Sequence, residues 1–383
     1  MTETAFTGVH RNPLVPAPTV PAPTVHHREP ALRAAVTGLP GYVAGSRAQG
    51  ALTAALASNE SHYPPLPAVL DIVQSGALRL NRYPDLNAVA LRARIAKFLD
   101  VTDHQIAVGP GSVGVLQQIL TSVCDADDEV VFAWRSFEAY PILTSLAGAN
   151  PVPVPLTADE GHDLDGMLAA ITPRTKVILV CSPNNPTGVA IDHDRLAAFL
   201  AAVPPQVLVV IDEAYVEFVD APDRLDALTL FRRHRNVCVL RTFSKAYGLA
   251  GLRVGYAVAH AGLAEGLRRA ALPFGVSALA QQAAIASLDA VDEIRDRVNL
   301  VVTERRRVTE TLRATGWALP DSQANFLWVR AVGERQEALM AAFHAADVLV
   351  RPYRTDGIRI TLADAVTNDR VIMVLAAMTA SAA

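Results

Sequence analysis

A lysine follows an apolar run in the stretch RTFSKAYGLAGLRVGY, residues 241–256. Lys245 comes directly after Ser244, with Thr242 before them and Arg253 eight positions after the lysine. A lysine that is buried, or that lies near other cations, retains enough neutral amine to form a Schiff base with an aldehyde. Hydroxyl and guanidinium groups are suitable donors to a phosphate. The stretch therefore predicts a covalent anchor for a phosphorylated aldehyde, whereas an isolated Ser-Lys pair is more often a solvated surface feature.

An aspartate ends another apolar run, VLVVI, at residues 207–211. Asp212 is costly to bury without a cationic partner. A pyridine ring is a suitable partner, because the carboxylate keeps its nitrogen protonated and the protonated ring withdraws electrons from a carbanion beside it. The phenol of Tyr215 could bond an oxygen of the same ring. The alternatives are a helix cap or a magnesium ligand, and the absence of a GxxxxGK[ST] motif disfavours magnesium.

Two turns contribute further polar groups that could bind the same ligand. GPGSVG places Ser112 at the start of a predicted helix, whose free backbone amides could bind a phosphate. SPNNPTG follows the run VILVC and presents the side-chain amide of Asn185. Each signal is weak alone, but pyridoxal phosphate is the ligand that requires all of them together.

The elements that must position these residues are buried strands alternating with helices. Apolar runs predict strands, and helical periodicity is found at 114–123 and 194–203. The predicted strands lie within 104–108, 128–134, 176–181, 207–215, 236–243 and 253–259. In an open parallel sheet, ligands bind beyond the carboxyl ends of the strands, which is where the polar residues stand. The predicted fold class is α/β, with a mostly parallel sheet flanked by helices and a smaller α+β domain.

The pattern of the chain changes at both ends. Residues 1–28 form a proline-rich tail with a repeated VPAPT unit, a composition typical of extended chain. Residues 61–284 are predicted to form the large domain that binds the cofactor. Residues 29–60 together with 285–383 are predicted to form the small domain, with strands within 325–330, 347–353 and 357–362.

Composition limits the function classes. The chain has 383 residues and a formal charge of −4, without long runs of either sign, which argues against binding a nucleic-acid backbone. Cys124, Cys181 and Cys238 lack the spacing of a disulfide framework or a zinc site, so no metal is expected. No stretch reads as a signal peptide or a membrane span. The sequence predicts a soluble, cytoplasmic protein that acts on small molecules.

From about residue 31 to the end, the chain resembles the fold-type I pyridoxal-phosphate aminotransferases of the histidinol-phosphate aminotransferase group. Within that group it is most similar to the aromatic amino acid (phenylalanine) aminotransferases of actinobacteria. The motifs that carry the resemblance are ASNES, NRYPD, WRSFEAYP, SPNNPTG, VVIDEAYVEF, RTFSKAYGLAGLRVGYAVA, SQANFLWV and VRPY.

The resemblance assigns roles around pyridoxal 5'-phosphate. It implies that Lys245 forms the Schiff base, that Asp212 pairs with the ring nitrogen, that Asn185 and Tyr215 contact the ring hydroxyl, and that Phe137 stacks on the ring. The phosphate would be bound by Ser112, the Val113 amide, Thr242, Ser244, Arg253, and Tyr83 of a neighbouring subunit. Many relatives have an acidic residue in place of Val113, so this contact can involve only the backbone. A shared site of this kind implies a homodimer.

Substrate contacts are expected from the small domain and the entrance segment. Arg359 in GIRITL is costly in a strand unless an anion meets it, and a guanidinium can bind an α-carboxylate through two hydrogen bonds. Arg351, Tyr42 and Asn185 are further candidates, with a structural ion pair as the alternative for Arg351. No substrate contact is assigned to Asn59, because SNES differs from the commoner NEN form.

The predicted activity is a reversible, ping-pong transfer of the amino group of phenylalanine or tyrosine to 2-oxoglutarate. Two alternatives use the same cofactor: a histidinol-phosphate aminotransferase, and a decarboxylase of similar fold. A transcription regulator would need a DNA-binding module before residue 30, which the proline-rich tail does not supply.

Overall fold

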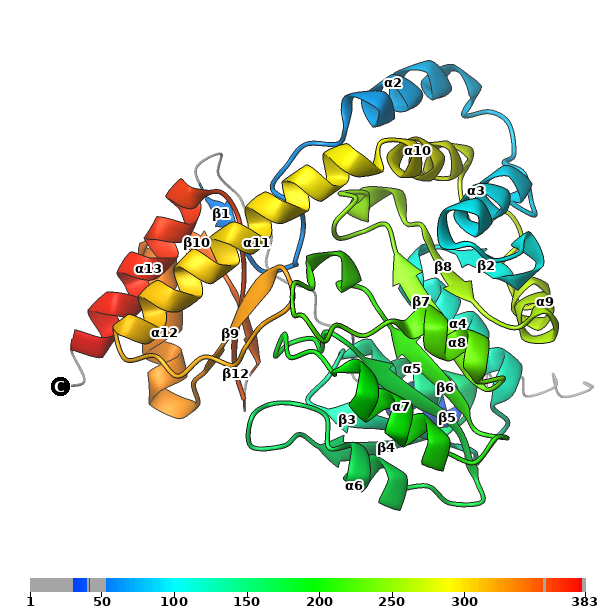
Figure 1. Ribbon diagram of the computed structural model, residues 1–383, viewed down its shortest axis with the longest axis horizontal. Coiled ribbons are helices and arrows are strands. Elements are labelled where there is room, and N and C mark those ends of the chain that lie inside the picture. Colours follow the sequence, from blue (N-terminus) through cyan, green and yellow to red (C-terminus); the bar gives the residue numbers. More distant parts are fainter. Residues whose placement is uncertain (1–29, 40, 42–52, 354–355, 381–383) are drawn as a thin grey trace, which may run out of the picture.

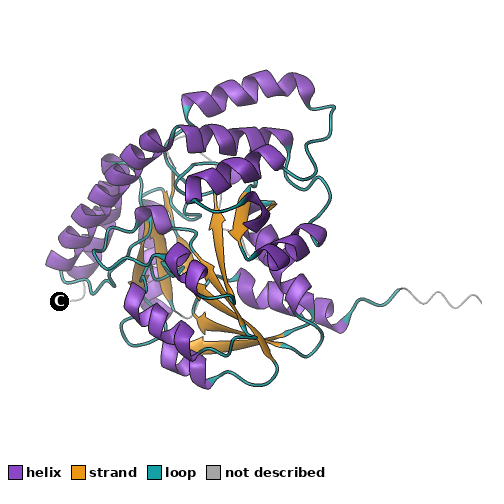
Figure 2. Ribbon diagram, turned by 45° about the vertical axis from the view of Figure 1, so that its right-hand side comes forward, coloured by secondary structure: helices purple, strands orange, loops and turns teal. Residues whose placement is uncertain are grey.

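The computed structural model describes residues 30–39, 41, 53–353 and 356–380 (Figure 1). A large sheet with helices on both faces forms one part, and a smaller group of strands and helices lies beside it (Figure 2). Helix α11 (Val291–Ala314) extends from the helices at the edge of the large part into the smaller one. The predicted fold class is therefore confirmed.

Seven strands form the large sheet, in the order β2-β8-β7-β6-β5-β3-β4. Strand β8 is antiparallel to both of its neighbours, and the other pairs are parallel. The strands are β2 (Ile106–Gly109), β3 (Glu129–Trp134), β4 (Asn150–Pro155), β5 (Thr175–Cys181), β6 (Leu208–Asp212), β7 (Val237–Thr242) and β8 (Gly255–Val258).

The central strands are apolar on both faces because helices cover both sides. In β5, Ile178 and Val180 pack in one hydrophobic core, while Val177 and Leu179 pack in the other. Side chains of α6, α7 and α8 join the first core, and side chains of α4, α5 and α9 join the second. Strands buried on both faces read as continuous apolar runs, which explains why the sequence predicts them.

Strands and α-helices alternate from β2 to β7. In chain order the α-helices are α1 (Ala34–Thr37), α2 (Pro67–Gly76), α3 (Val89–Leu99), α4 (Gly111–Val123), α5 (Ala139–Ala147), α6 (Leu164–Ala169), α7 (His193–Ala202), α8 (Ala227–Arg233), α9 (Ala261–Arg269), α10 (Ala278–Asp289), α11, α12 (Gly333–Ala345) and α13 (Ala365–Ala380). Side chains of Asp192, Asp226 and Ser277 accept backbone hydrogen bonds at the starts of α7, α8 and α10, which fixes where these helices begin. No described helix is long and apolar enough to cross a membrane.

Strand β4 was not predicted, because its sequence NPVPVP contains three prolines. Proline lacks the amide hydrogen that a central strand needs on both sides, so it usually argues against a strand. Strand β4 lies at the edge of the sheet and pairs only with β3, which makes the prolines tolerable.

The smaller part contains two short sheets. Strands β11 (Arg351–Tyr353), β12 (Gly357–Thr361) and β9 (Phe326–Arg330) form an antiparallel sheet in that order, and β1 (Ala54–Ala55) pairs with β10 (Val348–Leu349). The predicted strand at 347–353 is thus divided between two sheets. The division of the chain into domains at residues 28, 60 and 284 stays a prediction.

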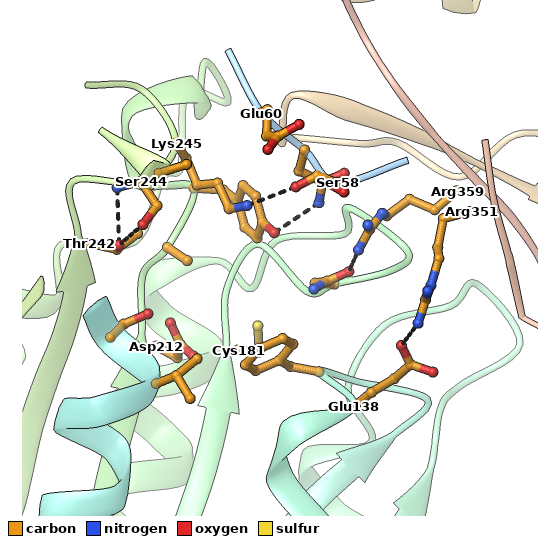
Figure 3. Close-up of a pocket in the computed structure, with 18 of the residues that line it drawn as sticks. Ser58, Glu60, Glu138, Cys181, Asp212, Thr242, Ser244, Lys245, Arg351 and Arg359 are labelled. Carbon is orange, nitrogen blue, oxygen red and sulfur yellow. Dashed lines mark hydrogen bonds and ion pairs between the residues drawn. The ribbon is translucent and has the colours of Figure 1, made fainter. Parts of the chain in front are cut away.

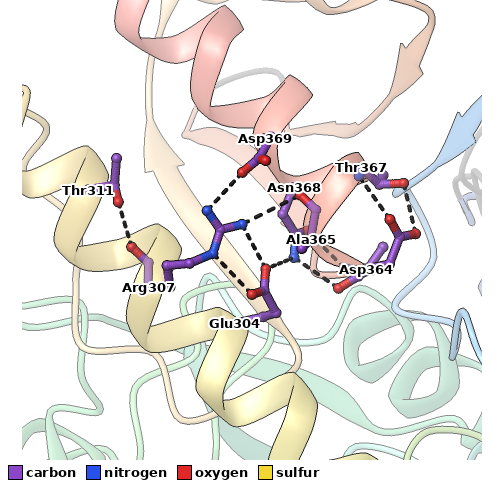
Figure 4. A network of polar contacts seen from close by, with 9 residues as sticks. Glu304, Arg307, Thr311, Asp364, Ala365, Thr367, Asn368 and Asp369 are labelled. Atoms are coloured by element: carbon purple, nitrogen blue, oxygen red, sulfur yellow. Dashed lines mark hydrogen bonds and ion pairs between the residues drawn. The ribbon is translucent and has the colours of Figure 1, made fainter.

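Helix α13 is held against α11 by a polar network (Figure 4). Arg307 of α11 binds Glu304 and Asp369 at 2.8 and 2.7 Å, and Asn368 donates to Glu304 at 2.9 Å. The network fixes the start of α13 immediately after β12, the strand that carries Arg359.

Candidate active site

A cavity of about 440 Å³ lies at the carboxyl ends of the central strands (Figure 3). This volume is within the usual range for a small-molecule site. The large sheet and the smaller part both contribute to its lining, which consists of Ala57, Ser58, Asn59, Glu60, Ser112, Val113, Phe137, Glu138, Cys181, Asn185, Asp212, Ala214, Tyr215, Thr242, Ser244, Lys245, Ala250, Arg253, Arg351 and Arg359.

Strand register brings the polar residues together. Cys181 ends β5 opposite Asp212, which ends β6 opposite Leu240 of β7. Thr242 ends β7, and Ser244 and Lys245 follow in the next turn. These side chains therefore meet at one edge of the sheet, as the positions of the predicted strands imply.

Asp212 has one satisfied and one unsatisfied carboxylate oxygen. Its side chain is buried, and the Tyr140 hydroxyl donates to Oδ2 at 2.8 Å, while Oδ1 has no partner among the described residues. Burial raises the pKa of Asp212 to about 6, against the lowering effect of the Tyr140 hydrogen bond. An unpaired buried carboxylate oxygen on a cavity wall is a position for a ligand that supplies a proton or a positive charge.

Lys245 is half-buried, and its Nζ donates to the Ser58 carbonyl oxygen at 3.1 Å. Burial, together with the positive charges of Arg359 and Arg253, lowers the pKa of Lys245 to about 7. Close to neutral pH, a large fraction of this amine is therefore unprotonated and able to attack a carbonyl carbon or to accept a proton.

Hydrogen-bond donors gather around the turn after β7. Thr242 Oγ1 donates to Ser244 Oγ at 2.9 Å, and Arg253 Nη1 approaches the same oxygen at 3.4 Å. A Cβ atom on Gly111 would lie 2.4 Å from Arg253 Nη2, and one on Gly255 would lie 2.4 Å from the Ser112 nitrogen. Glycine at these two positions permits the close approach of the first turn of α4 to the Arg253 side chain and β8, and so creates a compact anion cradle.

Tyr215 is held by the entrance segment. The Asn59 side-chain amide donates to the Tyr215 hydroxyl oxygen at 2.9 Å, which leaves the phenolic hydrogen available for another acceptor. Asn59 is buried with a φ of 53°, and its backbone carbonyl accepts from Asn325 while its side-chain carbonyl accepts from Thr361. Asn59 thus contacts Tyr215 of the large part as well as the smaller part.

Two buried arginines extend into the cavity from β11 and β12. Arg359 Nη1 donates to Asn185 Oδ1 at 2.6 Å, and its Nη2 donates to the Ala57 carbonyl at 2.7 Å. The Nε of Arg359 is buried without a partner. Arg351 instead forms an ion pair with Glu138 at 2.7 Å. The alternative of a structural ion pair, weighed for Arg351 from the sequence, is thus present in the structure.

Most of the predicted site residues line this one cavity. Those brought together are Ser112, Val113, Phe137, Asn185, Asp212, Tyr215, Thr242, Ser244, Lys245, Arg253, Arg351 and Arg359. Tyr83 does not line it: its ring is 82% exposed and stacks on Phe274 at 4.6 Å. Tyr42 lies outside the described residues.

Sequence reasoning missed several residues around the cavity. Glu138 and Tyr140 belong to the quoted motif WRSFEAYP, but no local pattern indicates that they reach Arg351 and Asp212. Ser58, Glu60 and Cys181 also line the cavity. Burial, with the nearby Asp212 charge, raises the pKa of the Cys181 thiol to about 12, so it remains protonated and unreactive.

The cavity fits pyridoxal 5'-phosphate. The unpartnered Asp212 Oδ1 can meet the ring nitrogen, the donors near Arg253 can meet a phosphate, and the Lys245 amine lies between these groups and Arg359 (Figure 3). Each group of the cofactor therefore has a chemically matched partner among the lining residues.

Known proteins give the same assignment. Residues 54–377 match the family described as aminotransferase class I and II. The chain is 51% identical over 342 residues to the aromatic amino acid aminotransferase of Streptomyces coelicolor, covering 89% of this chain and 95% of the relative. It is 49% identical over 338 residues to the protein of the same name from Mycolicibacterium smegmatis, covering 88% and 92%.

Solved structures agree in fold. A histidinol-phosphate aminotransferase from Sinorhizobium meliloti, in complex with pyridoxal-5'-phosphate, superposes with a TM-score of 0.83 at 28% identity, covering 93% of this chain and all of that one. An aspartate aminotransferase variant from Thermus thermophilus has a TM-score of 0.77 at 20% identity, covering 91% and 99% of the two chains, and supports the fold alone. The cofactor is accordingly pyridoxal 5'-phosphate, the substrates are amino acids and 2-oxo acids, and the chain belongs to the aminotransferase class I and II family.

Proposed function

We propose that this aminotransferase transfers the amino group of phenylalanine or tyrosine to 2-oxoglutarate, reversibly and with ping-pong kinetics. The observation that carries the proposal is a single cavity that combines the amine of Lys245, the unpartnered oxygen of Asp212 and the guanidinium of Arg359. The aromatic donor is supported by relatives named aromatic amino acid aminotransferases, with which this chain shares 51% sequence identity.

We assign the cofactor contacts by chemistry. Asp212 Oδ1 would pair with the ring nitrogen, and Asn185 and the free phenolic hydrogen of Tyr215 would contact the ring hydroxyl. Phe137 would stack on the ring. The phosphate would be bound by Ser112, the Val113 amide, Thr242, Ser244 and Arg253.

When bound, pyridoxal phosphate supplies an aldehyde that carries the amino group between half-reactions and a protonated ring that accepts electrons. Lys245 would hold the aldehyde carbon in the resting enzyme and, once displaced by the substrate, move a proton from the substrate's α-carbon. Its pKa near 7 suits both roles, because the neutral amine is well populated at neutral pH. Asp212 would keep the ring nitrogen protonated, because its ionised Oδ1 would accept a hydrogen bond from the ring N–H.

The substrate carboxylate would bind Arg359. The hydrogen-bond acceptors that Arg359 meets among the described residues are neutral: Asn185 Oδ1, the Tyr353 hydroxyl and the Ala57 carbonyl. A carboxylate would supply the negative charge that these neutral acceptors lack. Tyr42 stays a predicted substrate contact.

Charge in the cavity favours a neutral side chain over a phosphate. Arg351, the second arginine, already faces the Glu138 carboxylate. A dianionic phosphate would have to displace Glu138 from Arg351, whereas an aromatic ring would leave the ion pair intact. The histidinol-phosphate aminotransferase from Sinorhizobium meliloti, similar in structure at 28% identity, makes histidinol phosphate the second candidate donor. A decarboxylase of similar fold is the less favoured alternative.

We also propose a homodimer with a shared active site. Tyr83 is exposed beside a surface groove that includes Leu80, Pro84 and Phe274, and Leu78 and Leu80 are 89% and 70% exposed. Exposed apolar side chains in such a group favour contact with another protein surface. Tyr83 would reach the partner's cofactor phosphate. A cytoplasmic location stays a prediction from the cysteine pattern.

Steady-state kinetics of the holoenzyme test the donor. Phenylalanine, tyrosine and histidinol phosphate are compared with 2-oxoglutarate as acceptor. We expect phenylalanine to have the higher kcat/KM. A preference for histidinol phosphate of about tenfold, or 1.4 kcal/mol in the transition state, would overturn the aromatic assignment. Release of carbon dioxide without an acceptor would identify a decarboxylase.

A further inference from the structure

Two arginine side chains lie next to each other on one face of the sheet formed by β11, β12 and β9. Arg351 of β11 pairs in register with Arg359 of β12, so both side chains lie on the same face. Both are buried at 7% exposure, and both guanidinium groups lie over the Tyr353 ring, at 5.7 and 5.9 Å from its centroid. Like charges directly opposite each other destabilise a sheet unless anions meet them.

The two arginines have partners of different charge. Figure 3 shows Arg359 on the side of Lys245, and Arg351 ending at Glu138. Arg351 Nη2 contacts Glu138 Oε2 at 2.7 Å, whereas the acceptors found for Arg359 in the described residues are uncharged. Glu138 precedes α5 in the large part, so its ion pair crosses from the large sheet to the smaller part.

We propose that Glu138 is a specificity-determining residue, an internal carboxylate that occupies Arg351 until a substrate with a second anionic end displaces it. The inference rests on the proposed function, because it concerns how one cavity accepts two kinds of substrate. A ping-pong aminotransferase for phenylalanine and 2-oxoglutarate must bind a neutral side chain in one half-reaction and a carboxylate in the other.

The geometry suits such an exchange. With a neutral side chain in the cavity, Glu138 keeps Arg351 paired, so no buried guanidinium lacks an anion. When a dicarboxylate binds Arg359 through one end, its other carboxylate can take the place of Glu138 at Arg351. The Glu138 side chain is 29% exposed, against 9% for Arg351, so the released carboxylate can turn into water while the arginine stays in place.

The test uses Glu138→Gln holoenzyme and two unreactive ligands, glutarate with two carboxylates and 3-phenylpropionate with one. Isothermal titration calorimetry should show glutarate binding about tenfold more tightly than to the parent enzyme, because no internal carboxylate competes. The affinity for 3-phenylpropionate should change by less than about twofold. In single half-reactions, kcat/KM for glutamate should rise and that for phenylalanine should stay nearly constant.

Two variants separate this role from a structural one. Adding Arg351→Gln to Glu138→Gln should abolish the gain for glutarate, because the gain requires the Arg351 guanidinium. Glu160→Gln is the matched control: Glu160 pairs with Arg330 of β9 at 2.6 Å, also between the two parts but outside the cavity lining. It should leave the affinities for both ligands unchanged.

The proposal is wrong if Glu138→Gln weakens glutarate binding, changes both ligands equally, or is reproduced by Glu160→Gln. It is also wrong if the gain persists in the double variant. These outcomes are independent of the donor assignment, because that assignment fails on the parent enzyme, by poor turnover of phenylalanine, before any variant is made.

Discussion

The two ends of the cavity are built in different ways. At the cofactor end, Thr242, Ser244 and Arg253 contact one another across a few residues of chain, on elements of the large sheet. At the substrate end, Arg359 bonds Ala57 and Asn185, which are 302 and 174 residues away in sequence. The cofactor end is therefore defined by one sheet, whereas the substrate end exists only where the smaller part packs against it.

Because of this difference, we expect that substrate preference and cofactor binding can be changed separately. Substitutions in β11 or β12 should alter substrate preference while the cofactor stays bound. Substitutions at the carboxyl ends of β6 and β7 should alter cofactor binding or chemistry for every substrate alike. The predictions below test this separation, beginning with the largest expected effect.

Replacing Lys245 with alanine should nearly abolish transamination while the cofactor is retained. The loss should be about 10⁴-fold in the proton-transfer step, the upper range for removing a general acid–base group. Asp212 and the phosphate donors do not depend on Lys245 for their positions. Rapid-quench kinetics would measure the loss, and absorbance after gel filtration would show the bound cofactor. An active variant, or one that binds no cofactor, would contradict the assignment.

Arg359→Gln should reduce kcat/KM for phenylalanine by roughly tenfold to a hundredfold, the scale for losing a charge-assisted hydrogen bond. Cofactor affinity should change less than kcat/KM, because Asn185 is the one described residue assigned to the cofactor that Arg359 contacts by a hydrogen bond. Arg351→Gln is the matched comparison, and it should affect phenylalanine less, because Arg351 is paired with Glu138. Equal losses in the two variants, or cofactor release, would break the proposed separation.

Asp212→Asn should stabilise the cofactor-free protein at neutral pH, but it should reduce the stabilisation that the bound cofactor provides. Burial raises the pKa of Asp212 to about 6 from its usual 3.8, so ionising it in the cofactor-free fold costs about 3 kcal/mol. The neutral carboxyl group of Asp212 therefore contributes this free energy to stability below pH 4, and the contribution is lost as the pH rises through 6. The cofactor-free variant should therefore be more stable than the parent at pH 7.5 and similar at pH 4.

The measurement is urea unfolding at the two pH values, with and without cofactor. Pyridoxal phosphate should stabilise the variant less than the parent, because the carboxylate that pairs with the ring nitrogen is gone. Equal pH dependence in the two cofactor-free proteins would show that Asp212 is not the group responsible.

Tyr83→Phe should have the smallest effect, a loss of about 1 kcal/mol in cofactor affinity, the scale for one hydrogen bond. In the proposed dimer, Tyr83 would add a contact from one subunit to the cofactor phosphate bound by its partner. Fluorescence titration of the cofactor-free variant would measure the loss, and sedimentation would report the dimer. A fully active monomer would refute the shared site.

The sequence predicted the fold and the cofactor end well for a physical reason. Parallel strands buried on both faces are continuous apolar runs, and the polar residues at their carboxyl ends mark the ligand edge directly. Strand β4 was missed because its prolines are permitted only by its edge position.

At the substrate end, sequence indicated Arg351 and Arg359 but not their partners. The ion pair with Glu138 and the hydrogen bond from Asn59 to Tyr215 join distant segments, and no local pattern encodes such a meeting. Tyr140 was missed similarly, because its bond to Asp212 depends on how α5 packs on the sheet.

The most direct test of the account is the identity of the lysine that holds the cofactor. Borohydride reduction of the holoenzyme, followed by peptide mapping, would place the pyridoxyl label on one of the chain's lysines: Lys97, Lys176 or Lys245. The account predicts the label on Lys245 in the peptide that follows β7. A label on Lys97 or Lys176 would contradict it.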